Sequence, residues 1–260
     1  MGAVDFAGFV DELAKVAGDA ILPFFRTALT IENKKLKGEF DPVTAADRGA
    51  ETAMRALIRE TFPAHGIVGE EFDDVNSGAP YTWVLDPIDG TKSFIAGMPA
   101  WGTLIGLLKD GAPVYGMMSQ PFIGERFTGD GASAKYRGRA GERKLMTRPC
   151  QTIEDALLYT TSPQLFSADE RKKFESVEKS ARLSRYGGDC YAYCMVAAGY
   201  VDLVIESGLD AYDIMPLIPI IEGAGGVVTN WQGGSAAEGG QVIAAGDKRV
   251  LEAAIARLST

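Results

Sequence analysis

Two aspartates stand three residues apart at the end of an apolar stretch of the chain. Asp86 and Asp89 lie in the run WVLDPIDGT, residues 83–91. The apolar residues 81–85 predict a buried strand, and Pro87, which has no amide hydrogen, prevents its simple continuation. We therefore expect Asp89 on a turn, where both carboxylates converge on one point. Two carboxylates about 4 Å apart repel by roughly 4 kcal/mol at an effective dielectric of 20, so the pattern indicates a cation between them.

The two residues after Asp89 suggest an anion site beside that cation. Gly90 lets the backbone approach a ligand closely. A helical turn that begins at Thr91 would leave amides free to bind a phosphate group. An ordinary acidic turn is the alternative, but it does not explain why the strand, the paired aspartates, the proline and the Gly-Thr step occur together. A cation site next to an anion site is what the chemistry of phosphate esters requires.

Acidic residues in three other segments could join this site, namely Asp47, Glu70 and Asp213. Each also has a structural interpretation: Asp47 fits the first turn of a helix, Glu70 the end of a strand, and Asp213 a helix N-cap. If the fold brings them to Asp86 and Asp89, the ligands are all oxygen atoms. Such a set favours Mg²⁺ or Mn²⁺ over zinc. Two such ions would stabilise the attacking and leaving oxygens of an in-line displacement.

Histidine and cysteine chemistry finds little support in the chain. His65 is the only histidine, and we expect it on a surface turn. No Ser-His-Asp or Cys-His arrangement is therefore supported. Cys150, Cys190 and Cys194 form a sparse, odd-numbered set. They indicate packing residues in a reducing compartment rather than a disulfide scaffold or a zinc site.

Composition excludes several classes of function. Among the 260 residues, 26 are Lys or Arg and 35 are Asp or Glu, and the net charge of −9 argues against binding to a nucleic-acid backbone. No run of apolar residues is long enough for a transmembrane helix. Residues 1–18 carry acidic side chains and lack the basic start of a secretory signal. We expect a cytoplasmic protein with neither a nucleic-acid nor a membrane partner.

Hydrophobic patterning predicts a layered α/β arrangement. The helical spacing of apolar residues predicts helices over 4–29, 44–62, 168–179, 191–199, 213–223 and 248–258. Short apolar runs between turn signals predict strands over 67–69, 81–85, 103–109, 114–119, 126–128, 156–159, 202–205, 226–229 and 242–245. The charged segment 31–40 suggests a hairpin or an exposed loop. We place a boundary near 145–155, between an N-terminal subdomain (1–150) with most metal ligands and a C-terminal one (151–260) that contributes Asp213.

The motifs together resemble those of the inositol monophosphatase superfamily, which are Mg²⁺-dependent, lithium-sensitive phosphatases. They lie at 41–47, 69–71, 83–91 and in the segment that ends at Asp213, in the order and approximate spacing of that family. The resemblance covers nearly the whole chain. It implies a layered α/β/α/β/α sandwich, a small phosphate-ester substrate, two or three Mg²⁺ ions per site with Mn²⁺ as a substitute, and a homodimer.

The resemblance also implies roles for individual residues. The metal ligands would be Glu70, Asp86, the Ile88 carbonyl, Asp89 and Asp213. Thr91, with Asp47 behind it, would polarise the attacking water, and Glu70 would take part in catalysis as well as in metal binding. The amides of Gly90 and Thr91 would hold the phosphate group. Glu71 would support its neighbour Glu70, and Lys37 would lie on a mobile hairpin that closes over a third metal position.

Two segments, 119–126 and 185–193, resemble the histidinol-phosphatase branch of the superfamily. Histidinol phosphate carries an ammonium group and an imidazole, which suit acids beyond the metal ligands. Asp189 and Glu206 are available for this role, and Glu206 matches the acid that contacts the non-phosphate part of the substrate. Arg185 would contact the substrate as well, although either acid could instead pair with it.

The predicted reaction is the hydrolysis of L-histidinol phosphate to L-histidinol and phosphate, a step of histidine biosynthesis, by in-line attack of a metal-activated water. The resemblance leaves an inositol-1-monophosphatase open, and also a broader phosphatase that acts on nucleotides or other small molecules. An inactive metal-binding regulatory protein is the alternative outside enzymes. The acid set and the presence of Thr91 and Asp47 argue against it.

Overall fold

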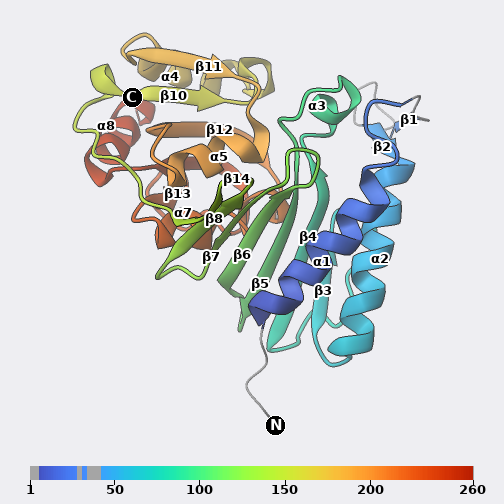
Figure 1. The fold of residues 1–260 in the computed structure, drawn as a ribbon. Helices are drawn as coiled ribbons and strands as arrows, with labels where there is room; N and C mark the ends of the chain where they lie inside the picture. Colours follow the sequence, from blue (N-terminus) through green and yellow to red (C-terminus); the bar gives the residue numbers. More distant parts are fainter. Residues whose placement is uncertain (1–5, 28–30, 34–41, 260) are drawn as a thin grey trace.

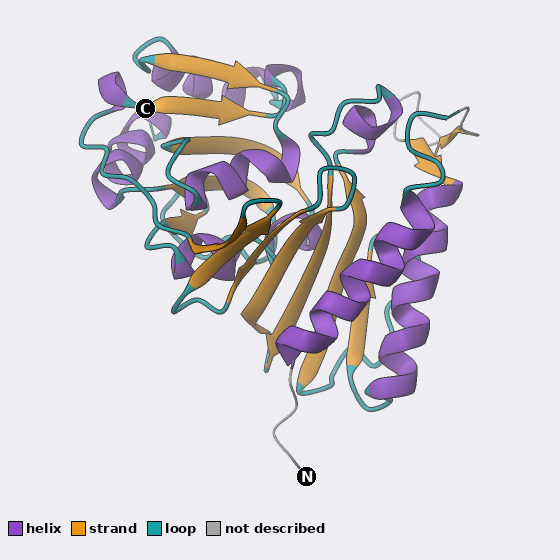
Figure 2. Cartoon of the chain, in the orientation of Figure 1, coloured by secondary structure: helices purple, strands orange, loops and turns teal. Residues whose placement is uncertain are grey.

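Helices and sheets alternate in layers through the molecule (Figures 1 and 2), as a computed structural model of residues 6–27, 31–33 and 42–259 shows. The described chain forms two large sheets, an N-terminal sheet of seven strands and a C-terminal sheet of five. One helical layer lies between the two sheets, and the outer face of each sheet is covered by a helical layer of its own. The predicted α/β/α/β/α sandwich is confirmed.

The outer helices of the N-terminal sheet are α1 (Phe6–Ile21) and α2 (Ala45–Thr61). Their apolar faces pack with Trp83 and other buried side chains of the sheet. Helix α1 is shorter than the predicted 4–29, because Pro23 lacks an amide hydrogen and disfavours helical backbone at the residue before it. No helix in the described ranges is both long and apolar enough to span a membrane.

The N-terminal sheet has the strand order β3-β4-β5-β6-β7-β8-β9. Its strands are β3 (Gly66–Gly69), β4 (Tyr81–Asp89), β5 (Gly102–Lys109), β6 (Ala112–Gln120), β7 (Glu125–Gly129), β8 (Ala134–Gly138) and β9 (Gly141–Lys144). Strand β3 is parallel to β4, and the other neighbours are antiparallel. A separate antiparallel pair, β1 (Ile31–Asn33) and β2 (Pro42–Thr44), flanks the predicted hairpin, most of which lies outside the described residues.

The C-terminal sheet has the order β11-β10-β12-β14-β13. Its strands are β10 (Leu157–Thr160), β11 (Leu183–Tyr186), β12 (Leu203–Leu209), β13 (Val227–Thr229) and β14 (Gly240–Ala245). Helices α4 (Ala168–Glu178) and α8 (Lys248–Leu258) cover its outer face, and α5 (Asp189–Ala197) and α7 (Ile218–Gly223) lie between the two sheets. Short helical turns complete the chain: α3 (Thr91–Ile95), α6 (Ala211–Ile214), η1 (Ile153–Asp155) and η2 (Pro163–Leu165).

The predicted helix 213–223 is wrong as a single element. The structure has α6 and α7 instead, separated by residues 215–217. Pro216 lies in this break and packs on Gly106 of β5 and Gly116 of β6, which pair with each other. A side chain at Gly116 would overlap the Pro216 carbonyl oxygen. Residues 215–217 therefore pack directly on the N-terminal sheet.

The core between the sheets draws residues from both halves of the chain. Leu104, Met118 and Phe127 of the N-terminal sheet share one buried cluster with Val204 and Ile220. The chain passes from one sheet to the other between Lys144 and Leu157. The division into subdomains near 145–155 stays a prediction.

Candidate active site

The end of β4 brings Asp86 and Asp89 to the same side of the sheet. In a regular strand, residues three apart point to opposite faces. Asp86 pairs with Leu104 and Asp89 with Gly102, so three steps along β4 match two along β5. This one-residue bulge re-aims the second aspartate. Asp89 therefore lies in a bulged strand and not on the predicted turn.

A buried hydroxyl holds the bulge. The side chain of Thr103 on β5 is 1% exposed and donates a 2.8 Å hydrogen bond to the Pro87 carbonyl. The Ile88 carbonyl, a predicted metal ligand, accepts a 3.0 Å hydrogen bond from the Thr91 hydroxyl. Pro87 has no amide hydrogen to donate to β5, but at the bulge the pairing between β4 and β5 is already interrupted, so the sheet tolerates the proline.

Asp213 reaches these residues from the other half of the chain. It is the third residue of α6, where its carboxylate accepts a 2.8 Å hydrogen bond from the Asp210 amide in a capping box. Asp210 is the N-cap, so the N-cap interpretation of Asp213 is wrong. One carboxylate oxygen from each of Asp86, Asp89 and Asp213 lies within 4.8 Å of the others.

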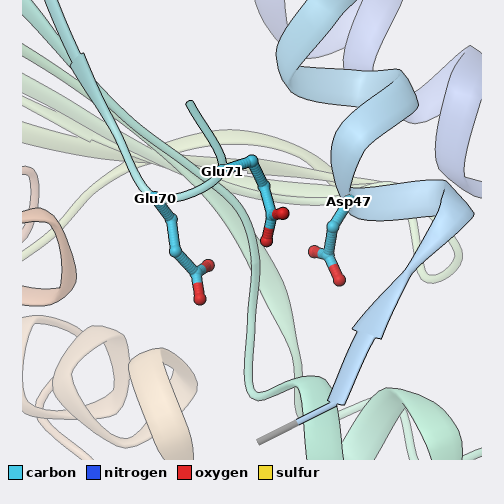
Figure 3. A group of neighbouring side chains, drawn as sticks. All are labelled: Asp47, Glu70 and Glu71. Atoms are coloured by element: carbon cyan, nitrogen blue, oxygen red, sulfur yellow. The ribbon is translucent and has the colours of Figure 1, made fainter. Parts of the chain in front are cut away.

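A second group of acids lies where α2 meets the segment after β3. Asp47, in the first turn of α2, and Glu70 and Glu71, which follow β3, each place a carboxylate oxygen within 4.8 Å of the others. Figure 3 shows the three side chains extending into the same space. Glu71 is predicted to have only a supporting role, whereas its carboxylate belongs to the group itself.

The two groups of acids influence each other. The pKa of Asp86 is raised well above its usual value, first by burial and then by repulsion from Glu70, Asp89, Asp213 and Asp47. Burial, followed by repulsion from Asp89, also raises the pKa of Asp213. Acids from four separate segments of the chain therefore form one electrostatic unit.

This unit fits a hard divalent cation. Its donors are carboxylate oxygens, with no His or Cys in either group. The Asp86 Oδ1 atom is buried and has no hydrogen-bond partner among the described residues. A buried, unpaired carboxylate oxygen is costly unless a cation or donor completes it. The residues present therefore match Mg²⁺ or Mn²⁺.

The turn after β4 offers backbone to a ligand. Gly90 has a φ of +85° and directly precedes α3. A Cβ at this position would lie 3.1 Å from the Asp189 side chain and 3.1 Å from the Ala100 carbonyl. Glycine thus provides both the left-handed conformation and the room. The predicted cooperation of Thr91 with Asp47 and the phosphate contacts of Gly90 and Thr91 stay predictions.

The two additional acids lie next to this turn. Asp189, the first residue of α5, has a φ of +43° and accepts a 2.8 Å hydrogen bond from the Ser93 hydroxyl. The next amide, that of Cys190, donates to Asp89 over 2.5 Å. Burial raises the pKa of Asp189, and the Ser93 hydrogen bond and Lys92 oppose this shift.

Glu206 on β12 is held by the backbone and hydroxyl of one residue. Thr161 donates to its carboxylate from the amide at 2.9 Å and from the hydroxyl at 2.7 Å. Burial raises the pKa of Glu206 to about 7, and Asp189 and Asp213 add repulsion. Thr161 and Ser93 could not be predicted, because each is separated from the acid that it binds by many residues and carries no local pattern.

Arg185 and Lys37 are the remaining predicted site residues, and their roles stay predictions. Arg185 is exposed on the edge strand β11, and no ion pair joins it to another described residue, so it does not pair with Asp189 or Glu206. Lys37 lies outside the described residues.

His65 lies on the predicted turn, where its amide donates a 3.0 Å hydrogen bond to the Phe62 carbonyl, but its side chain is not on the surface. It is half-buried, stacks on Phe62 at 4.6 Å between ring centroids, and accepts a 3.1 Å hydrogen bond from Trp83 Nε1. It therefore belongs to an aromatic cluster. The cysteines Cys150, Cys190 and Cys194 are buried and free, as predicted for packing residues.

Comparison with known proteins defines the class to which this site belongs. The model of the inositol monophosphatase family matches residues 5–260, so the chain is a member of this phosphatase family. A bifunctional phosphatase IMPL2 (chloroplastic) from Arabidopsis thaliana is 43% identical, over 97% of this chain and 75% of its own. A histidinol-phosphatase from Mycobacterium tuberculosis is 32% identical, over 94% and 92%. The structure of an inositol monophosphatase from Zymomonas mobilis is 42% identical with a TM-score of 0.87, covering 99% of this chain and 100% of that one.

Proposed function

We propose that this protein is a Mg²⁺-dependent phosphomonoesterase that hydrolyses L-histidinol phosphate to L-histidinol and phosphate. The observation that carries the proposal is the meeting of Asp86 and Asp89 with Asp213, from the opposite half of the chain, beside the group of Asp47 and Glu70. Membership of a phosphatase family supports the reaction class.

Two or three Mg²⁺ ions, or Mn²⁺ in their place, would be held by Glu70, Asp86, Asp89, Asp213 and the Ile88 carbonyl. When bound, such ions neutralise phosphate charge and lower the pKa of water. The chain's own groups orient the reactants. We assign the phosphate contacts to the amides of Gly90 and Thr91, and the orientation of the attacking water to Thr91 and Asp47. Glu71 supports this side of the site.

Substrate choice is assigned to Asp189 and Glu206. Both are acids outside the two metal-binding groups, and both are buried enough that burial raises their pKa. A cationic substrate compensates a buried carboxylate better than a neutral polyol does. The histidinol-phosphatases among the relatives support the same choice. Arg185 is assigned to the rim of the substrate site.

Steady-state kinetics on two substrates tests the assignment. We expect kcat/KM for L-histidinol phosphate to exceed that for inositol 1-phosphate by at least about tenfold, which corresponds to about 1.4 kcal/mol. Comparable or faster turnover of the inositol ester would refute the substrate while leaving the phosphatase intact. Absence of Mg²⁺-dependent phosphate release from either ester would instead favour a metal-binding regulatory protein.

An inositol monophosphatase is the second candidate. The similarity to the solved structure described under that name favours it. We further propose that the protein is a cytoplasmic homodimer. Light scattering on the purified protein tests the dimer, and a mass equal to the single chain would refute it.

A further inference from the structure

Three charged side chains are buried in one row along α2. Asp47, Glu51 and Arg55 are spaced by four residues and are 1%, 0% and 4% exposed. Residues four apart lie on the same face of a helix. Acidic and basic side chains are seldom fully buried unless they are paired. The first member of the row belongs to the acidic group of the site, so the other two require an explanation.

Glu51 and Arg55 form an ion pair that also binds backbone. The Arg55 Nε donates to Glu51 Oε1 over 2.6 Å, and the second Glu51 oxygen accepts a 2.8 Å hydrogen bond from the Glu71 amide. A Cβ at Gly69 would overlap the Glu51 carboxylate and lie 2.9 Å from the Arg55 guanidinium. The pair thus lies directly against the segment that carries Glu70.

The rest of the Arg55 guanidinium holds the same segment further along. Its two terminal nitrogens donate to the Phe72 carbonyl at 2.9 Å and the Asp73 carbonyl at 3.0 Å. The guanidinium carbon of Arg48 also lies over the Phe72 ring, 4.8 Å from the centroid of the ring. Arg55 can bind Glu51 and the two carbonyls at the same time, because the donors of a guanidinium are arranged in a planar fork.

Together the pair binds the backbone of residues 71, 72 and 73 to α2. Glu71 begins this stretch and Glu70 directly precedes it, and the carboxylates of both meet that of Asp47 on α2 (Figure 3). A buried ion pair is weak evidence for stability, because desolvation of the two charges offsets their attraction. Its position next to two acids of the site points to another role.

We propose that Glu51 and Arg55 are positioning residues that fix the Gly69–Asp73 segment against α2 and thereby set the affinity of the site for divalent cations. The inference rests on the proposed function, since it assumes that Glu70 binds a metal ion and that Asp47 and Glu71 lie beside that ion. Partners that orient ligands typically change metal affinity by about 10- to 100-fold when mutated.

Mn²⁺ binding, followed by the loss of the free-ion electron paramagnetic resonance signal, tests the proposal without turnover. Glu51→Gln places an amide where two donors need acceptors, and Arg55→Lys keeps the charge without the fork. We expect each variant to bind Mn²⁺ about 10- to 100-fold more weakly than the wild type. Circular dichroism verifies that each is folded.

A control pair lies where β10 and β12 begin, with an arginine side chain that is 44% exposed where that of Arg55 is 5% exposed. Asp202 is 1% exposed, pairs with Arg148 at 2.7 and 2.5 Å, and accepts a 2.8 Å hydrogen bond from the Leu157 amide. This arrangement has the same parts as the Glu51–Arg55 pair but supports no acid of the site. Arg148→Met should lower thermal stability and change the Mn²⁺ dissociation constant by less than about twofold, since it touches no ligand partner.

A double variant separates positioning from stability. Replacing both residues, Glu51→Met with Arg55→Met, removes the uncompensated charge and should recover part of the melting temperature lost in either single variant. Mn²⁺ affinity should stay weak, because the Glu71 amide and the two carbonyls have lost their partners. The inference is overturned if the folded single variants bind Mn²⁺ within about twofold of wild type, or if affinity recovers along with stability. A wild type that binds no Mn²⁺ would overturn the proposed function as well.

Discussion

The Asp89 carboxylate is half-buried, and the Cys190 amide that donates to it over 2.5 Å only partly compensates for its loss of solvent. Burial raises the pKa of Asp89 to about 7, and Asp189 adds repulsion. Glu206 shows the same pKa of about 7 in spite of two hydrogen bonds from Thr161. Without a cation, the site is therefore a local source of instability at neutral pH.

This predicts how the stability of the metal-free protein depends on pH. In the folded protein Asp89 and Glu206 hold protons up to about pH 7, whereas the unfolded chain releases them near pH 4. The folded state then binds more protons, so the free energy of unfolding falls as pH rises through this window. We expect the melting temperature with a chelator to drop by at least about 3 °C from pH 5.5 to pH 8.

Two controls belong to this measurement. Saturating Mg²⁺ should remove most of the drop, because a bound cation favours the ionised carboxylates. Asp89→Asn should flatten the slope, keep the fold, and lower turnover by more than about 100-fold. A melting temperature of the metal-free wild type that stays level or rises across the window would contradict this account of the acids.

Glu206 gives a second prediction, on specificity. Glu206→Gln keeps the size of the side chain and an acceptor for Thr161 but removes the charge. We expect KM for L-histidinol phosphate to rise by about tenfold, or about 1.4 kcal/mol, while the value for inositol 1-phosphate changes much less. Equal effects on both substrates, in parallel assays, would show that Glu206 does not recognise the cationic part of the substrate.

At the scale of the elements, the bulge in β4 shows what local sequence can and cannot reveal. Pro87 correctly signals an interruption between the two aspartates. Proline is compatible with both a turn and a bulge. Whether the chain forms the bulge depends on pairing with β5 and on the Thr103 hydroxyl. That partner is distant in sequence, so the residues around Asp86 could not indicate it.

Thr103 therefore offers a test of the bulge. Thr103→Val preserves shape but leaves the buried Pro87 carbonyl without its donor, which should cost about 1 to 3 kcal/mol of unfolding free energy. Mn²⁺ affinity should fall by about tenfold, because the two aspartates lose their relative placement. Thr103→Ser, which retains the hydroxyl, should keep most of the affinity. Identical Mn²⁺ binding by the valine and serine variants would mean that the bulge does not depend on this bond.

Other elements were predicted well where apolar periodicity is strong and poorly where it is weak. Helices α4 and α8 and strands β5, β10 and β14 lie close to their predicted ranges. Strand β9 was missed because all its side chains are exposed, and β11 because three of its four are. Pro216 is a local signal for the break between α6 and α7, because proline disfavours helical backbone at the residue before it. Its packing on Gly106 and Gly116 depends on another sheet and could not be predicted.

At the scale of the whole molecule, the site exists only because the two sheets pack together. Asp213 follows β12 of the C-terminal sheet. Pro216, in the break after α6, packs on Gly106 and Gly116 of the N-terminal sheet. Motif order identified the acids that meet here. Their distances depend on contacts between residues about a hundred positions apart, which a single sequence does not contain.

Asp213 is thus the residue on which the central claim can be tested most directly. The measurement is phosphate release from L-histidinol phosphate during a Mg²⁺ titration, for the wild type and Asp213→Asn. Asparagine can still accept the hydrogen bond from the Asp210 amide, so the fold should persist. We predict that release by the wild type requires Mg²⁺ and that the variant is slower by more than about 100-fold. Release that persists in the presence of a chelator, or a variant within about twofold of wild type, would contradict the claim that acids from both halves form one metal site.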